Sequence, residues 1–175
     1  MKPQFTDAVA TALQNAVQRA QESRHTQVTE NHLWIVFLQE KQGYFARLFH
    51  EIFPSSAPFV ASLEKSLSQE ATFETEQMPA ISPSLQQVIS KASLLAEKGN
   101  DSYVGSDHIF RALIESTKEP FASFKKQHPV SEKKIEDTLQ RLRGSHMMDS
   151  PSAESKLQAL DKYCTNLTKR AKEGK

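Results

Sequence analysis

An internal repeat is the feature that most constrains how this chain folds. The stretch "VTENHLWIVFL" at 28–38 is followed 76 positions later by "VGSDHIFRALI" at 104–114, so His32 corresponds to His108. The same offset, without a gap, pairs apolar residues elsewhere: Val9 with Leu85, Ala16 with Ala92, Phe45 with Phe121, and Leu63 with Leu139. A repeated unit buries against its copy the faces that it cannot cover alone. The sequence therefore predicts two similar units packed together.

Each unit has the pattern of amphipathic helices. Apolar residues recur at spacings of three and four in the first helix of the first unit: Val9, Ala12, Leu13, Ala16 and Ala20. Thr6 and Ser82, the latter followed by proline, are placed to cap the first helices. No alternating pattern of useful strand length is found. The expected fold class is all-α, with two pseudo-symmetric four-helix repeats packed into one domain, followed by a linker and a short helical tail.

Composition divides the chain into three segments. Residues 1–144 form the expected double-repeat domain, with repeats at about 5–69 and 81–143. Within 141–155 the helical pattern gives way to Gly, Ser, Pro and Asp, so residues 145–158 are expected to be a flexible linker. Residues 159–175 resume a helical rhythm with too few apolar side chains to fold alone. We therefore expect this tail to belong to a further structure.

Charge and cysteine content narrow the class of protein. The chain has 22 Lys and Arg against 21 Asp and Glu, a formal net charge of +1. This balance gives no global field for nucleic acid or an anionic membrane, so neither is an expected partner. Apolar runs are too short to span a bilayer, and the N-terminus lacks the apolar core of a secretory signal. With a single cysteine, Cys164, an internal disulfide is impossible, and a cytoplasmic location is expected.

Sequence motifs of catalysis are missing. There is no phosphate-binding loop, nucleophile elbow, zinc-protease helix or paired-cysteine zinc spacing. His32 and His108 are repeat mates, so a duplicated packing or hydrogen-bonding role explains them better than metal ligation. Cys164 lacks a basic partner, and His146 with its neighbouring methionines lacks further metal ligands. We assign no catalytic residue, metal or cofactor to this segment.

The seam between the two units is the candidate binding surface. Pseudo-symmetric helical units commonly leave a shallow apolar groove where they meet. A groove rimmed by acids such as Asp101 and Asp107 would suit extended apolar or basic peptide segments. The preference for this interpretation is modest, because acidic residues at a rim also occur as ordinary solvated surface.

Two quoted patterns carry a resemblance to a known family. The doubled pattern "T-x-x-x-x-x-A-L-x-x-A-x-x-x-A" followed by "V-x-x-x-H-L/I" resembles the Clp N-terminal repeat domain. The tail "ALDKYCTNLTKRAKEGK" at 159–175 is similar to the segment that leads into the first ATPase module of Clp-type AAA+ proteins. The connection before it is similar in length and layout to that of ClpB-type protein disaggregases. ClpA- and ClpC-type unfoldases are the nearest alternatives.

This resemblance implies a non-catalytic, substrate-binding domain. In the family, such a domain is tethered to a homohexameric AAA+ ring, whose ATPase modules bind ATP and magnesium. It engages exposed apolar segments of unfolded or aggregated polypeptides and delivers them to the ring. The isolated domain is expected to be a monomer. The alternative is an adaptor-docking domain of a protease-linked unfoldase, and a small enzyme built on the histidines and Cys164 is a third hypothesis.

Four residues match functional positions of the family: Thr6, Leu95, Asp101 and Asp107. Thr6 matches the threonine that opens the first helix and borders the groove, and Leu95 matches a groove leucine. The two aspartates match acidic positions implicated in substrate coupling. His108 matches a histidine to which we assign a structural role. Lys91 occupies a groove position that is apolar in the family, which weakens the predicted groove.

Overall fold

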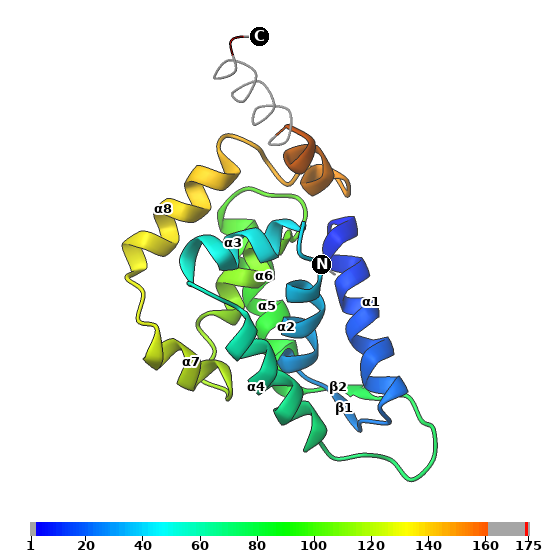
Figure 1. Ribbon diagram of the computed structural model, residues 1–175. Coiled ribbons are helices and arrows are strands. Elements are labelled where there is room, and N and C mark those ends of the chain that lie inside the picture. Colours follow the sequence, from blue (N-terminus) through cyan, green and yellow to red (C-terminus); the bar gives the residue numbers. More distant parts are fainter. Residues whose placement is uncertain (1–2, 161–173, 175) are drawn as a thin grey trace.

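The helices of the structure repeat with the spacing seen in the sequence (Figure 1). The computed structural model describes residues 3–160 and 174. The first unit contains α1 (Asp7–Glu22), α2 (Glu30–Gln39), α3 (Tyr44–Ile52) and α4 (Ala57–Ser68). The second unit contains α5 (Pro83–Lys98), α6 (Ser106–Leu113), α7 (Phe121–Gln127) and α8 (Glu132–Arg143). Adding 76 to the bounds of α1 gives the bounds of α5, so the expected all-α double repeat is confirmed.

Side-chain caps set where the first helix of each unit begins. Thr6 Oγ1 accepts a hydrogen bond from Val9 N–H at 3.4 Å. Ser82 Oγ accepts one from Leu85 N–H at 3.1 Å, and Pro83 begins the helix. These bonds satisfy backbone donors that have no partner within the helix. Because the two caps occupy related positions, α1 and α5 start in the same register, as the sequence predicts.

The two units are joined by reciprocal backbone pairing. The short strand β1 (Gln27–Val28), which precedes α2, pairs in parallel with β2 (Ala80–Ile81), which precedes α5. At the related positions of the other half, Phe5 and Val104 form a parallel bridge. Thus the segment before each first helix pairs with the segment before the other unit's second helix. Neither unit is complete without its copy.

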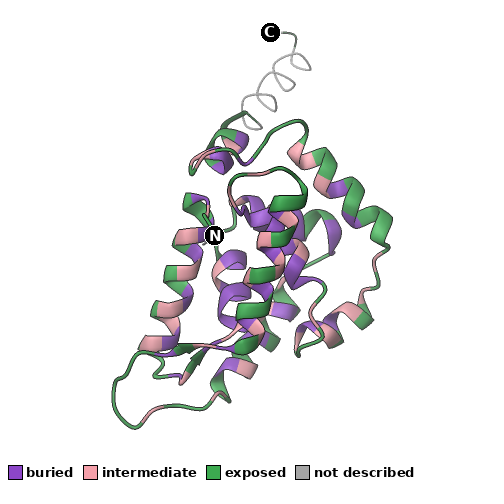
Figure 2. Cartoon of the chain, turned by 180° about the vertical axis from the view of Figure 1, so that it is seen from behind, coloured by how far each residue is buried: buried purple, intermediate pink, exposed green. Residues whose placement is uncertain are grey.

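The core is an aromatic cluster to which both units contribute. Trp34 of α2 is fully buried. Its ring lies 4.8–6.0 Å, between centroids, from the rings of Phe45, Phe49, Phe59 and Phe121. Edge-to-face contacts dominate, which is the arrangement that aromatic quadrupoles favour. Figure 2 shows the buried residues gathered at the centre of the molecule and the exposed residues along its outer faces.

The segment after α8 differs from the flexible linker that its composition predicts over 145–158. Met148, Ala153 and Leu157 are buried against the repeat units, and residues 153–160 are helical. The prediction rested on the average polarity of the segment. A few apolar side chains are enough to attach a polar segment when they can be buried against the domain. The predicted segment 159–175, including Cys164, lies outside the described residues apart from 159, 160 and 174.

Candidate functional site

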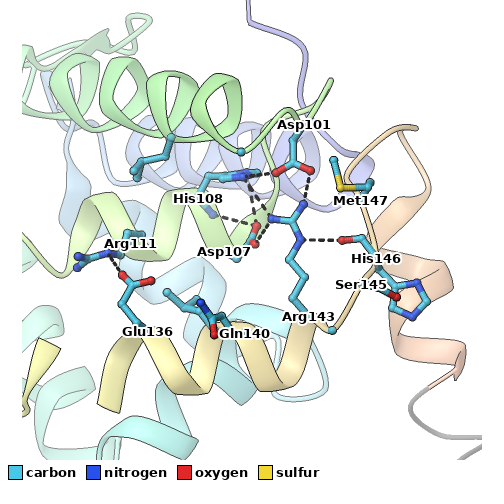
Figure 3. Close-up of a pocket in the computed structure, with 14 residues that line it drawn as sticks. Asp101, Asp107, His108, Arg111, Glu136, Gln140, Arg143, Ser145, His146 and Met147 are labelled. Carbon is cyan, nitrogen blue, oxygen red and sulfur yellow. Dashed lines mark hydrogen bonds and ion pairs between the residues drawn. The ribbon is translucent and has the colours of Figure 1, made fainter. Parts of the chain in front are cut away.

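Three of the four residues singled out from the sequence line one cavity. Leu95, at the C-terminal end of α5, and Asp101 and Asp107 border a cavity of about 440 Å³ (Figure 3). The opposite wall consists of α8 and the residues that follow it, including Leu139 and Met147. The cavity therefore combines apolar side chains with charged residues, a composition common in ligand-binding cavities.

Arg143, the last residue of α8, bonds both aspartates of this cavity. Its Nη1 donates to Asp107 Oδ2 at 2.7 Å, and its Nη2 is paired with Asp101 Oδ1. The side chains are 16% exposed for Arg143, 2% for Asp101 and 7% for Asp107. Burial lowers the pKa of Arg143, but the facing carboxylates of Asp107 and Asp101 outweigh burial, so the pKa lies above its ordinary value. The aspartates are thus engaged inside the fold and do not form an acidic rim.

His108 holds the same cluster in place. Gly105 N–H donates to His108 Nδ1 at 2.8 Å, which closes the start of α6. Since a backbone N–H only donates, Nδ1 is the acceptor, and the neutral ring carries its proton on Nε2. His108 Nε2 lies 2.9 Å from Asp101 Oδ2 and donates to it. The structural role expected for this histidine is what the geometry shows.

Sequence reasoning missed Arg143. It is the last residue of an amphipathic helix, directly before Gly144, and nothing in the local sequence distinguishes it from the other basic residues of α8. The repeat alignment contained a usable signal, because Arg143 corresponds to Leu67 in the first unit, an apolar residue that is buried. A charge at a position whose repeat mate is apolar indicates a polar partner elsewhere in the second unit.

Thr6 and Lys91 lie away from this cavity. Thr6 is fully buried, and its hydroxyl donates to Glu154 Oε2 at 2.6 Å. The fourth predicted site residue is therefore separate from the other three. Lys91 forms an ion pair with Glu115 on the face between α5 and α6, where both line a smaller cavity of about 190 Å³. The unfavourable residue noted in the sequence is thus not in the cavity that contains Leu95.

The first unit repeats the histidine geometry with a second histidine as the partner. Thr29 N–H donates to His32 Nδ1 at 2.9 Å, and His32 Nε2 lies 2.8 Å from His25 Nδ1. Burial, together with the nearby His25 and Arg19, lowers the pKa of His32 to about 4. Within the described residues, no group of three or more His, Cys, Asp or Glu is arranged to hold a metal ion.

Comparison with known proteins identifies the family. The family described as the Clp repeat (R) N-terminal domain matches residues 4–128. The chain belongs to the Clp repeat N-terminal domain family. It is 40% identical over 172 residues to a protein named chaperone protein ClpB from Chlamydia pneumoniae, covering 98% of this chain. It spans 20% of the length of that Clp-family relative.

Solved structures of Clp-family N-terminal domains share the fold. The Hsp104 N-terminal domain from Candida albicans is 25% identical, with a TM-score of 0.72, covering 86% of this chain and 99% of that one. A ClpV N-domain in complex with a VipB peptide is 18% identical, with a TM-score of 0.59, covering 78% and 85%. In the described part of the chain, every helix is too short or too polar to cross a membrane.

Proposed function

We propose that this domain binds exposed hydrophobic segments of unfolded or aggregated proteins and passes them to a hexameric AAA+ ring. The observation that carries the proposal is the cavity lined by Leu95, in which apolar side chains lie beside the ion pairs of Arg143 with Asp101 and Asp107. Leu95 and Leu139 contribute apolar contact area, while Arg143 pairs with the two aspartates, so that an apolar ligand covering them buries no unpaired charge. Similarity to ClpB chaperones over 98% of the chain supports this role.

A shallow cavity of this size gives weak binding. Ordering a client segment offsets much of the contact free energy, so one domain alone would hold a segment only briefly. Several domains tethered to one ring would bind an aggregate more strongly through their effective concentration. Weak individual binding also lets the segment leave for the ring. ATP and magnesium belong, in this proposal, to ATPase modules outside this segment, which itself performs no catalysis.

Docking of a folded adaptor is the second candidate function. A ClpV N-domain of the same fold has been solved with a VipB peptide, so the fold accommodates a peptide from a partner protein. An adaptor would bind in a defined ratio and as a folded protein. A disaggregase client would bind only when denatured.

The test compares binding of the whole chain to a heat-denatured model protein and to the same protein in its native form. Leu95→Ala should weaken binding to the denatured form several-fold, because Leu95 lines the cavity. Leu94→Ala is the matched control: Leu94 is the neighbouring residue, is 56% exposed, and does not line the cavity.

Binding that is equal for native and denatured protein, or absent for both, would favour adaptor docking. Equal losses in Leu94→Ala and Leu95→Ala would contradict the cavity as the binding surface. Circular dichroism of each variant checks that helicity is retained.

A further inference from the structure

Residues 148–158, named here the strap, lie across the N-terminal ends of α1 and α6. Two backbone bonds attach the strap: Tyr103 N–H donates to Met148 O at 2.9 Å, and Asp7 N–H donates to Pro151 O at 2.8 Å. A third bond runs from Met148 N–H to Asp101 Oδ1 at 2.9 Å. The strap is therefore a docked element that also contacts a charged residue of the cavity described above.

Glu154 is the polar anchor of the strap. One of its carboxylate oxygens accepts from Ser106 N–H at 2.6 Å, and the other accepts from the Thr6 hydroxyl at 2.6 Å. The residue is 2% exposed. Backbone N–H groups at the start of a helix favour a carboxylate, so Glu154 bridges the first turns of α1 and α6.

The first unit has a buried glutamate at the related helix start. Ser106, the first residue of α6, corresponds to Glu30, the first residue of α2. Glu30 is 3% exposed; burial raises its pKa, and hydrogen bonds from Ser116 and Ser84 act in the opposite direction without outweighing burial. The first unit therefore supplies its own buried carboxylate, whereas the second unit has serine at the related position and receives the carboxylate from the strap.

A second cavity lies beneath the strap. It has a volume of about 320 Å³ and lies between α1 and α2, with Ser155 and Gln158 of the strap at its edge. Phe37 and Phe45 line it, and so does Tyr44, whose buried hydroxyl has no hydrogen-bond partner among the described residues. Release of the strap would open an apolar surface that carries an unused polar group.

We propose that the strap is an intramolecular competitor for client segments at this face, which rests on the function proposed above. The Thr6 hydroxyl and the Ser106 N–H bind one carboxylate, so the strap and a client carboxylate cannot occupy them together. The chemistry of the strap defines the client that competes with it: an aspartate or glutamate with an apolar residue directly before it and another three residues after it, as Ala153 and Leu157 are placed around Glu154. Such segments bind when the strap is released.

The experiment uses the whole chain and Glu154→Ala, with Glu97→Ala as the matched control. Glu97 is an exposed glutamate on α5. Hydrogen exchange at the amides of Asp7, Tyr103 and Ser106 reports strap docking, because these amides donate to the strap. Fluorescence anisotropy measures binding of labelled, reduced and carboxymethylated α-lactalbumin, which is permanently unfolded.

Glu154→Ala should speed exchange at those three amides and tighten client binding about tenfold, the factor expected if the strap is docked nine-tenths of the time. Glu97→Ala should change neither. Leu157→Ala provides a second variant, which loosens the strap while leaving the carboxylate in place. It should change exchange and binding in the same direction.

Unchanged exchange in both strap variants would overturn the proposal, since the strap would not be held as described. Faster exchange with unchanged or weaker client binding would also overturn it, while leaving the proposed function intact. If exchange is faster but neither the original chain nor any variant binds the client, the proposed function is wrong. The proposed competition between strap and client is then wrong as well.

Discussion

The two repeat units place the same histidine at the same helix start but surround it with different chemistry. The first unit has His25, Asn31, His32 and Leu67 where the second has Asp101, Asp107, His108 and Arg143. In both units the histidine Nδ1 accepts from the backbone N–H before the helix. Only its partners differ: one set consists of a histidine, an asparagine and a leucine, and the other of two acids and a guanidinium. The duplicated scaffold is thus separable from the site built on it.

This difference is accompanied by a different position of the fourth helix. α4 buries Phe59, Leu63 and Leu67 and packs on α2. In α8 the residue related to Leu67 is Arg143, and the helix packs on α3, with the 440 Å³ cavity between α8 and α6. In the first unit, apolar side chains of α4 pack directly on α2. In the second unit, Arg143 of α8 instead forms ion pairs with Asp101 and Asp107. The exchange of leucine for arginine is therefore associated with the candidate site.

The largest expected effect comes from replacing the arginine with its repeat mate. Arg143→Leu leaves Asp101 and Asp107 buried without a counter-charge, and it should lower the free energy of unfolding by about 3–5 kcal/mol. Urea denaturation of the whole chain measures the loss.

A triple variant sharpens the same comparison. Asp101→His, Asp107→Asn and Arg143→Leu together install the residues of the first unit, and they should recover most of the stability that Arg143→Leu loses. If the triple variant is as unstable as Arg143→Leu, the first-unit residues do not stabilise each other by themselves. They would then depend on the position that α4 has in the first unit.

The second effect distinguishes the two helix caps. Thr6→Ala removes a cap and also a hydrogen bond to the buried Glu154, so we expect a loss of about 2–3 kcal/mol. Ser82→Ala removes a cap and a hydroxyl contact with Ser84 but no bond to a buried carboxylate, and should cost about 1 kcal/mol. Equal losses, measured by urea denaturation, would show that the bond from Thr6 to Glu154 adds no net stability.

The third effect is a dependence on pH. His32 has a folded pKa of about 4 against an ordinary 6.5, so the stability that the neutral ring provides is complete above pH 6.5 and is lost as the pH falls towards 4. Burial raises the pKa of Glu30 and of Glu154, which acts in the opposite direction: their contribution is present below pH 4.5 and is lost as the pH rises. The net change is therefore smaller than the two effects above.

His32→Gln isolates the histidine contribution. Glutamine is a common hydrogen-bonding residue at this third helical position, and it does not titrate. The free energy of unfolding of the variant should fall less than that of the original chain between pH 6.5 and 4. Parallel profiles for the two proteins would show that His32 does not carry the dependence.

The smallest effect concerns a backbone position that both units share. Arg24 and Asn100 are repeat mates with φ values of 58° and 59°. Asparagine tolerates this left-handed conformation better than arginine. Arg24→Asn should therefore stabilise the protein by about 0.5 kcal/mol, and Asn100→Arg should destabilise it by about as much, as measured by thermal unfolding. A stabilising Asn100→Arg would contradict this account.

Much of the fold was predictable because it follows from local patterns. The apolar spacing around Val9 and Ala16, the caps at Thr6 and Ser82, and the offset of 76 each constrain the chain over a few turns or between exact copies. The candidate site was predictable only in part. Leu95, Asp101 and Asp107 do share a cavity, but Thr6 lies apart from it, and the exposure expected of the aspartates is absent. Their roles in binding stay a prediction.

By itself, the sequence determined two copies of a four-helix unit, the start of each first helix, and a family resemblance that the comparison confirmed. Only the tertiary structure decided that Arg143 neutralises Asp101 and Asp107, and that Glu154 reaches Thr6 from 148 positions away. The physical reason is that a helical pattern fixes which face of a helix is buried. The partner of a buried charge depends on how far apart the helices stand, which is settled only when all of them pack together.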